Sequence, residues 1–377
     1  MTNAASEAVT TPLAATVGAS DTRVWGMTSQ ARLERTFQRL GLTRTDAAGA
    51  SPTAGVLLAH AAWIFDESLI RSLAARPETV LTDEAGRPVA AHVSANEAIA
   101  AGAMLEHGAG GSDAWRRLSA TELAGDYNSA LRKREPPVLV KLTPATVRSV
   151  EKRLFQGSYK GVTDLVTKYV WPTPARIVTR WCALAGMTPN QVTFASFVLV
   201  LAAMWLFWTG HFGWGLAAAW VMTFLDTVDG KLARVTLQSS PIGNVFDHSI
   251  DLIHPPFWWW AWIVGVQLGP HPPMRPETIL AVVVGGYVAQ RLLEGLFIAA
   301  FKVEMHAWRP FDSVFRLITA RRNPNLILLT AAALAGRPDV GMLLVAVWTA
   351  LSLLVHLAQC LQAAAAPRGS VVSWLSR

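Results

Sequence analysis

The sequence predicts an all-α polytopic membrane protein with six transmembrane helices, preceded by a small cytoplasmic α/β domain. Hydrophobic residues make up 52% of the 377 residues and charged residues only 16%, whereas charged residues are about a quarter of an ordinary soluble domain. The chain also has 16 tryptophans and a mean hydropathy of +0.31. From residue 190 onward the apolar runs lengthen toward the roughly 20 residues that a spanning helix needs.

The first third of the chain has the pattern of a soluble domain. Residues 1–20 are rich in Ala and Thr and lack the basic-then-apolar order of a secretory signal, so we expect a disordered lead-in. Residues 21–135 alternate short apolar runs with amphipathic segments, which indicates a cytoplasmic α/β domain. The expected elements are helices at 33–42 and 66–75, strands at 55–64 and 79–82, and a turn at 83–86.

A juxtamembrane segment follows at residues 136–189. Its part from 144 to 185 is helical in period and rich in Lys, Arg, Tyr and Trp, but its apolar residues do not form an uninterrupted spanning length. Aromatic and basic side chains are favourable at the membrane interface, so we expect helices that lie on the membrane surface. A first spanning helix in this segment is the alternative.

Residues 190–366 form the expected six-helix domain, and 367–377 a cytoplasmic tail. The spans are read at 192–209, 213–225, 257–268 with the turns before it, 279–301, 326–335 and 340–366, of which the fifth is short. The segment 302–322 carries five basic residues, whereas the loops near 211, 271 and 338 carry few. Basic loops stay in the cytoplasm, so this loop and both termini are expected there, in the inner membrane of the cell.

Four aspartates lie where the second span ends and the third begins. Asp226 and Asp229 are three residues apart, and Asp247 and Asp251 are four apart after a short polar turn, so each pair shares a helix face. Carboxylates that converge at a membrane boundary repel one another and need a cation between them. An all-oxygen site favours Mg²⁺, Mn²⁺ or Ca²⁺, and such ions bind phosphates. Gly230 and Gly243 leave space beside them.

These residues carry a resemblance to a known family. Asp226-x-x-Asp229-Gly230-x-x-Ala233-Arg234, followed by Gly243-x-x-x-Asp247-x-x-x-Asp251, is similar at every position to the signature of the CDP-alcohol phosphotransferases. The segment from Thr188 to Thr193 resembles the entry to that family's nucleotide pocket. The resemblance extends over residues 144–366.

The resemblance implies a reaction and roles for these residues. A phospho-alcohol passes from a CDP-alcohol to an acceptor hydroxyl, and CMP leaves. Two divalent ions, Mg²⁺ or Mn²⁺, are held by Asp226, Asp229 and Asp247 with help from Asp251, and Asp251 is also the candidate base. The expected nucleotide-binding residues are Gly230, Ala233, Arg234, Gly243, Asn190 and Thr193.

The fourth span and the basic loop contain a candidate acceptor pocket formed by Arg291, Glu294, Arg309 and Arg321. Arg291 and Glu294 are three apart and are expected to pair. The basic residues of the loop have the alternative role of fixing topology. The expected partners are a CDP-alcohol donor, an alcohol or phospho-alcohol acceptor, membrane lipid and a second copy in a homodimer, but no nucleic acid. The acceptor, and whether the donor is CDP-diacylglycerol or a soluble CDP-polyol, stay open.

A cation-coupled transporter is the alternative function, because such proteins also place acids inside the membrane. The front domain resembles a nucleotidyltransferase, as in fused inositol-phosphate cytidylyltransferase/di-myo-inositol-phosphate-phosphate synthases. It lacks a glycine-rich phosphate loop, and Ala61-Ala62-Trp63 stand where an active relative has a metal-binding Asp, with only Asp66 following. We therefore expect a catalytically inactive remnant.

Overall fold

A computed structural model describes residues 12–45, 55–108, 110–128, 131–239, 241–367 and 369–376, without the side chains at 241, 242, 244 and 247. The chain divides into two compact units. The first contains Met1–Tyr127, Glu135–Ser158 and Val235–Leu237, and the second contains Asn128–Arg134, Tyr159–Arg234 and Gln238–Arg377. The segment 136–189 is therefore divided between the units after residue 158.

The first unit is built on a mixed five-stranded sheet. Its strands, in spatial order, are β1 (Leu13–Val17), β4 (Val56–His60), β7 (Pro88–Val93), β6 (Thr79–Thr82) and β8 (Arg116–Leu118). The outer pairs β1–β4 and β6–β8 are parallel, and the inner pairs with β7 are antiparallel. The described strands also form three two-stranded ribbons: β2 (Arg23–Val24) with β3 (Met27–Thr28), β9 (Tyr127–Asn128) with β10 (Lys133–Arg134), and β5 (Trp63–Phe65) with β11 (Leu139–Lys141). The second unit contains β10.

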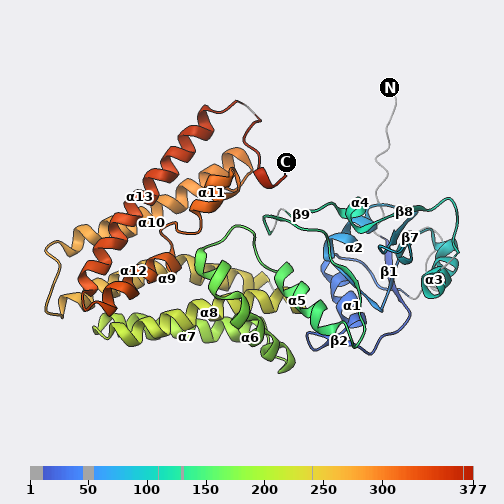
Figure 1. Ribbon diagram of the computed structural model, residues 1–377, viewed down its shortest axis with the longest axis horizontal. Helices are drawn as coiled ribbons and strands as arrows, with labels where there is room; N and C mark the ends of the chain where they lie inside the picture. The colour runs from blue at the N-terminus through green and yellow to red at the C-terminus, as the bar shows by residue number, and fades with distance from the viewer. Residues whose placement is uncertain are drawn as a thin grey trace. The chain divides into compact units, whose positions relative to one another are not determined.

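Helices cover both faces of this sheet. Alternate side chains of β4 point to opposite faces, so Leu57 packs under α1 (Ser29–Arg39), α2 (Glu67–Ala74) and α4 (Ala120–Ala124). Leu58 packs on the other side against α3 (Ala98–His107), which follows the short η1 (Ala95–Glu97). Figure 1 shows α1 and α3 on opposite sides of the sheet. The unit is a three-layer α/β/α sandwich.

Three expectations for the first unit need correction. The lead-in was expected to be disordered through residue 20, but 13–17 form an edge strand, because its apolar side chains are buried against β4. The strand expected at 55–64 is two strands, β4 and β5, separated at Ala61 and Ala62. The helix expected at 33–42 begins four residues earlier, where Thr28 caps it through Ala31 N–H. Residues 1–11 are outside the described part.

The second unit is helical from residue 166 onward. After α5 (Val147–Gly157), which belongs to the first unit, come the π-helix η2 (Val166–Val170) and α6 (Pro172–Leu184). Six helices then correspond in order to the six expected spans. They are α7 (Pro189–Trp208), α8 (Phe212–Thr236), α9 (Pro241–Gln267), α10 (Pro276–Phe301), α12 (Arg322–Leu334) and α13 (Pro338–Ala365). The short η3 (Met305–Ala307), α11 (Pro310–Phe315) and η4 (Trp374–Ser376) complete the described elements.

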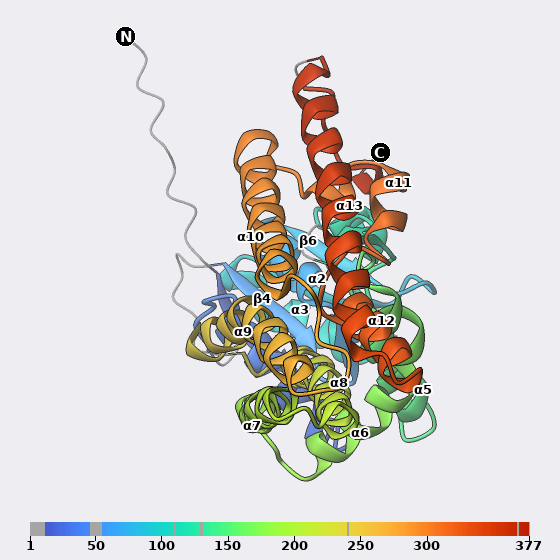
Figure 2. The same cartoon turned by 90° about the vertical axis from the view of Figure 1, so that its left-hand side faces the viewer.

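These helices pack around an aromatic core. α7 packs on α9, and α13 packs on both α10 and α12. Figure 2 shows α10 and α13 side by side. Phe207, Trp258 and Trp262 are fully buried where α7 meets α9. Large apolar side chains such as Phe194 and Trp205 are exposed on the outside of α7. A helix that is apolar all round fits a lipid environment.

Three of the described helices, α7, α10 and α13, are long and apolar enough to cross a membrane. The chain is thus a membrane protein with an N-terminal α/β unit and a helical C-terminal part. Of the other three expected spans, α8 and α9 are more polar because they carry the aspartates, and α12 is short, with 13 residues.

Candidate active site

The aspartates of the motif lie on α8 and α9. Asp226 and Asp229 are in the second half of α8, and Asp251 is in the first half of α9. Asp247 lies on α9 one turn before Asp251, and its side chain is outside the described part of the structure. The three described carboxylates differ in burial: Asp229 is 3% exposed as a residue, and the side chains of Asp226 and Asp251 are 17% and 43% exposed.

Asp229 is held by α7. Its Oδ2 accepts a hydrogen bond of 2.7 Å from Thr193 Oγ1, and its Oδ1 accepts one from the Gly230 N–H. Thr193 is near the start of α7, where the capping box of Thr188 and Gln191 fixes the first turn. Asn190 is exposed in that same turn. The structure thus joins one nucleotide-site residue of the sequence analysis, Thr193, directly to a motif aspartate.

Asp226 and Asp251 meet at a guanidinium from a third helix. Arg322, the first residue of α12, donates from Nη2 to Asp226 Oδ2 and from Nη1 to Asp251 Oδ1, both at 2.5 Å. One planar group reaches both carboxylates, so their oxygen atoms lie close together. From the sequence, Arg322 was expected to contact a substrate phosphate or to fix the topology, and its pairing with the two aspartates was not predicted. The signal in the sequence is the pair Arg321-Arg322 immediately before the fifth expected span.

The carboxylate set fits a hard divalent ion. The described groups that could bind a metal here are carboxylate oxygen atoms. The two carboxylates that pair with Arg322 come from different helices, as in a site that a cation holds together. Thr193 fixes the orientation of the third carboxylate, which is the kind of outer contact that positions metal ligands. The residues that are present therefore fit Mg²⁺ or Mn²⁺ better than zinc.

Of the remaining motif residues, Gly230, Ala233 and Arg234 lie on α8, and Gly243 lies in the first turn of α9. A Cβ built at Gly230 would be 3.1 Å from Arg234 Nη2, so the missing side chain gives the guanidinium its place. The next residue, Lys231, is 3% exposed, and its Nζ lies 3.3 Å from the centroid of the Tyr159 ring. A lysine so deeply buried was not recognised from the sequence, where it reads as a membrane-interface charge.

A cavity of about 450 Å³ opens beside Asp251. Arg291, Glu294 and Arg321 of the expected acceptor pocket line it. Arg309 is not among the lining residues; it pairs with Asp312 and lies over the Trp308 ring. The described part of the lining has six basic and four acidic side chains: Arg132, Lys160, Arg291, Arg316, Arg321 and Arg322, against Asp164, Asp251, Glu294 and Glu304.

Glu294 is the centre of a charged network in this cavity. Arg291 Nη2 donates to its Oε1 at 2.7 Å, which is the expected intrahelical pair, and Arg321 Nη2 donates to its Oε2 at 2.5 Å. His306 Nε2 is 3.2 Å from Oε1. His306 is buried, and this burial lowers its pKa to about 3, against the opposing effect of its hydrogen bond to Glu294. The imidazole is therefore neutral at pH 7.

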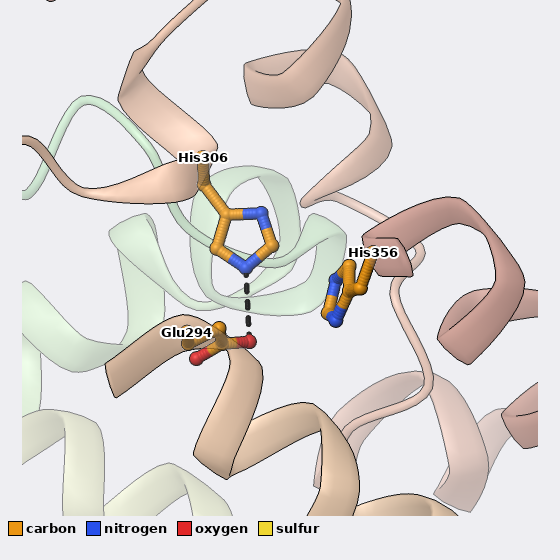
Figure 3. Close-up of side chains that lie close together, drawn as sticks. All are labelled: Glu294, His306 and His356. Atoms are coloured by element: carbon orange, nitrogen blue, oxygen red, sulfur yellow. Dashed lines mark hydrogen bonds and ion pairs between the residues drawn. The ribbon is translucent and has the colours of Figure 1, made fainter. Parts of the chain in front are cut away.

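The same network includes His356 of α13. Figure 3 shows the His356 ring turned toward Glu294 and His306, and ligand atoms of the three residues lie within 4.8 Å of one another. This spacing alone would suit a metal ion. However, Glu294 is the one carboxylate among these three residues, and it already pairs with Arg291 and Arg321. Arg321 Nη2 is also 3.4 Å from His306 Nε2. Two guanidiniums against one carboxylate repel a cation and attract an anion.

The cavity wall next to α12 is fixed by Asp164. Its side chain caps η2 by accepting from the N–H groups of Val166 and Thr167, and it accepts from Asn323 Nδ2 at 2.9 Å. Burial opposes its ionisation, but Arg316 and these hydrogen bonds outweigh burial and bring the pKa of Asp164 below its ordinary value. The carboxylate stays charged and orders the start of α12, from which Arg321 and Arg322 extend.

Comparison with known proteins identifies relatives of the helical part. Residues 186–355 match the model of the CDP-alcohol phosphatidyltransferase family. A phosphatidylinositol phosphate synthase from Mycobacteroides abscessus is 37% identical over 20% of this chain and 38% of its own length. A bifunctional IPC transferase and DIPP synthase from Rubrobacter xylanophilus is 29% identical over 53% of this chain and 43% of its own length. The chain thus spans about two fifths of these two relatives.

A solved structure is also similar. It is the Mycobacterium tuberculosis phosphatidylinositol phosphate synthase in complex with manganese and citrate, which is 19% identical, with a TM-score of 0.41 over 52% of this chain and 92% of that chain.

Proposed function

We propose, from the match of residues 186–355 to the model of the CDP-alcohol phosphatidyltransferase family, that this protein transfers a phospho-alcohol from a CDP-alcohol to an acceptor hydroxyl and releases CMP. The observation that carries the proposal is the convergence of Asp226 and Asp251 on the guanidinium of Arg322. Carboxylates from two helices then face the same space, beside a cavity large enough for a substrate.

The proposed metal ligands are Asp226, Asp229, Asp247 and Asp251. Bound divalent ions would supply charge neutralisation for a diphosphate. The chain's own contribution is positioning: Thr193 fixes Asp229, and Asp164 orders the start of the helix that carries Arg322. The proposed nucleotide contacts are Gly230, Ala233, Arg234 and Gly243 with Asn190 and Thr193.

Asp251 is the proposed base. It is the most exposed of the three described carboxylates and the only one of them that lines the cavity, so an acceptor hydroxyl can approach it. The acceptor oxygen forms a bond to the β-phosphorus as the bond from that phosphorus to CMP breaks, and the hydroxyl proton passes to the Asp251 carboxylate. Catalysis by position and charge is typical of phosphoryl transfer.

The cavity favours an acceptor that itself carries a phosphate. Among the described residues that line it, six basic side chains against four acidic ones leave an excess of positive charge. Arg291 and Arg321 are anchored by Glu294, and guanidinium forks bind phosphate in two-point geometry. A relative of this chain is a phosphatidylinositol phosphate synthase by name, which supports an inositol phosphate or a similar polyol phosphate as the acceptor.

The proposal includes the arrangement in the membrane. Six helices would span it: α7, α8, α9, α10, α12 and α13. The aspartates and the basic loop 302–322 would lie on the cytoplasmic side of the inner membrane. The N-terminal unit would be a non-catalytic scaffold, and the enzyme a homodimer. In that unit Asp66 caps α2 by accepting from Ser68 N–H, so this carboxylate has a structural use.

The test is CMP release by the purified full-length protein with Mg²⁺ or Mn²⁺. CDP-diacylglycerol and a water-soluble CDP-alcohol are each combined with inositol phosphate, glycerol phosphate, free inositol and serine, and products are read by mass spectrometry. We expect release that requires metal and a phosphorylated acceptor. No release with any pair would contradict the enzyme, and proton- or sodium-driven uptake into vesicles would favour the transporter.

A further inference from the structure

The C-terminal segment 369–376 folds back onto the helical unit. Val371 is 8% exposed. It packs in one apolar cluster with Phe297 of α10 and with Met305 and Trp308 of the loop between α10 and α12. Figures 1 and 2 both show the C-terminus beside α11. The segment is thus a packed part of the second unit.

Trp374 connects this segment to the loop through a series of hydrogen bonds. Its backbone N–H donates to the Trp308 carbonyl at 3.2 Å, and its indole Nε1–H donates to Ser313 Oγ at 2.9 Å. The Ser313 hydroxyl in turn donates to the His306 carbonyl at 2.7 Å. A hydroxyl has one proton to donate, so the bond that Ser313 accepts from Trp374 orients this proton toward His306. The indole N–H therefore supports the position of the His306 backbone.

The loop needs such outside support at His306. This residue lies in η3, which has three residues, and a 3₁₀ turn of this length has little stability of its own. The neighbouring helix α11 is anchored separately, because its buried Asp312 accepts a hydrogen bond of 2.9 Å from Gln359 of α13. That anchor fixes α11, and the contacts of Ser313 and Trp374 extend it to η3.

His306 links the loop to the candidate acceptor pocket. It lines the cavity of about 450 Å³ that contains this pocket. Its Nε2 atom lies 3.2 Å from Glu294 Oε1, as Figure 3 shows. Glu294 in turn holds the guanidiniums of Arg291 and Arg321. A displacement of η3 would therefore change the hydrogen bonding of Glu294, and the two arginines would lose their defined positions.

The motif aspartates are held by different contacts. Thr193 orients Asp229, and Arg322 contacts the carboxylates of the two other described aspartates. These contacts involve α7, α8, α9 and α12, whereas the path from Trp374 runs through α11 and η3 to α10. A defect in that path should thus affect the acceptor and leave the CDP-alcohol bound as before.

We propose that Trp374 is a positioning residue for the acceptor pocket. The segment 369–376 holds η3 in place, so that His306 keeps Glu294 and its two guanidiniums in the arrangement that binds the phosphate of the acceptor. Trp374 is not among the described residues that line the cavity, so it acts through Ser313 and His306. The inference rests on the proposed function and adds to it a residue that controls acceptor binding from outside the cavity.

The test uses Trp374→Phe in the full-length protein. Phenylalanine keeps an aromatic ring for packing but removes the indole N–H. We expect the KM for the phosphorylated acceptor to rise about fivefold, as for the loss of one ordinary hydrogen bond, and the KM for the CDP-alcohol to stay within about twofold. The matched control is Trp214→Phe, at a residue of α8 that is 74% exposed, and it should leave both KM values unchanged.

Two double variants test the path itself. Ser313→Ala removes the hydroxyl and should raise the acceptor KM as much as Trp374→Phe does. The double variant should show no larger rise, because both changes break the same path. Trp374→Phe should also add nothing when His306 is already replaced by Gln. A full additional rise in either double variant, or an equal rise in the KM of both substrates, would overturn the proposal.

Hydrogen exchange without substrate separates this inference from the proposed function. The amides of residues 305–315 should exchange faster in Trp374→Phe than in the unmodified protein, whereas those of α12 should keep their rate. Thermal melting checks that the variant is folded, and Ser313→Ala replaces it if it is not.

The possible failures are distinct. If the unmodified protein releases no CMP with any substrate pair, the proposed function is wrong, and the exchange rates alone decide on the segment. Unchanged exchange at 305–315 would then overturn its role in holding η3. If the unmodified protein is active, an unchanged acceptor KM in Trp374→Phe would overturn the positioning role.

Discussion

The N-terminal sheet and the helical unit bury different kinds of side chain. Both faces of the sheet are covered by Val, Leu and Ala, and the turn after β4 carries Ala61 and Ala62. Its few buried polar groups pair with backbone, as His92 does with the Leu73 carbonyl. The helical unit buries Asp229 and Lys231 near one another on α8.

Burying a charge costs several kcal/mol unless partners compensate it, so a unit that buries many charges retains them for a use other than stability. Among the described residues, the helical unit buries four charged side chains, Asp164, Asp229, Lys231 and Asp312, and the first unit buries two, Arg32 and Glu151. We therefore expect the chemistry in the helical unit. Loss of a carboxylate or a guanidinium should therefore reduce CMP release when the residue belongs to the helical unit, and should reduce only local stability when it belongs to the sheet unit.

The largest effect is expected at Asp251. Asp251→Asn keeps the shape of the side chain but removes the carboxylate that would accept the acceptor proton, so kcat for CMP release should fall about 10³-fold. Binding of the CDP-alcohol should change much less. The measurement is single-turnover CMP release with saturating Mn²⁺. A rate within tenfold of the unmodified protein would contradict the role of Asp251 as base.

Removal of the shared guanidinium should expose the repulsion between carboxylates. In Arg322→Gln, Asp226 and Asp251 lose their common partner, so without metal the free energy of unfolding should fall by about 3 kcal/mol. Mn²⁺ should restore more stability to this variant than to the unmodified protein, because the guanidinium no longer competes for the same oxygen atoms. Chemical unfolding with EDTA or Mn²⁺ measures both. Equal stabilisation by Mn²⁺ in the two proteins would argue against a shared site.

Two arginines of the basic loop offer a matched pair. Arg321→Lys replaces a guanidinium that lines the cavity, whereas Arg309→Lys replaces a guanidinium that pairs with Asp312 outside the cavity. We expect the KM for a phosphorylated acceptor to rise about 30-fold in the first and to stay within twofold in the second. The KM for the CDP-alcohol should be unchanged in both. A similar rise in both variants would remove Arg321 from the acceptor pocket.

His306 should make stability depend on pH. Burial lowers its pKa to about 3, so the folded protein binds fewer protons than the unfolded chain below the ordinary value of about 6.5. The stabilisation is complete above pH 6.5 and should decrease by about 1.4 kcal/mol per unit as the pH falls from there toward 3. His306→Gln should flatten this slope, and His211→Gln, an exposed loop histidine, should keep it. Unfolding at pH 7 and 5 provides the test.

The smallest effect is expected in the sheet unit. Asp66→Ala removes the cap of α2 and should lower local stability by about 1 kcal/mol. CMP release should not change by more than twofold, because this carboxylate contacts the Ser68 N–H and hydroxyl. Hydrogen exchange of the α2 amides measures the first expectation. A large loss of CMP release would show that the N-terminal unit takes part in the reaction.

Local patterns in the chain predicted much of this molecule. The long apolar runs indicated helices at the six positions where α7 to α10, α12 and α13 are found, because backbone groups in lipid must be satisfied within the helix. The spacing of Asp226, Asp229 and Asp251 placed them on helix faces, since side chains three or four residues apart lie on one side. The edge strand β1 was missed, because five residues without a partner strand have no distinctive period.

Which residues lie on one helix, and which face they share, follows from the chain alone, because helical geometry is fixed over a few residues. Which side chains from distant segments meet depends on the packed fold. It brings Arg322 to Asp226 and Asp251, Thr193 to Asp229, and His306 with His356 to Glu294. It also separates Arg309 from Arg321, which look alike in the chain. Such contacts depend on how whole helices pack, and no local pattern encodes that packing.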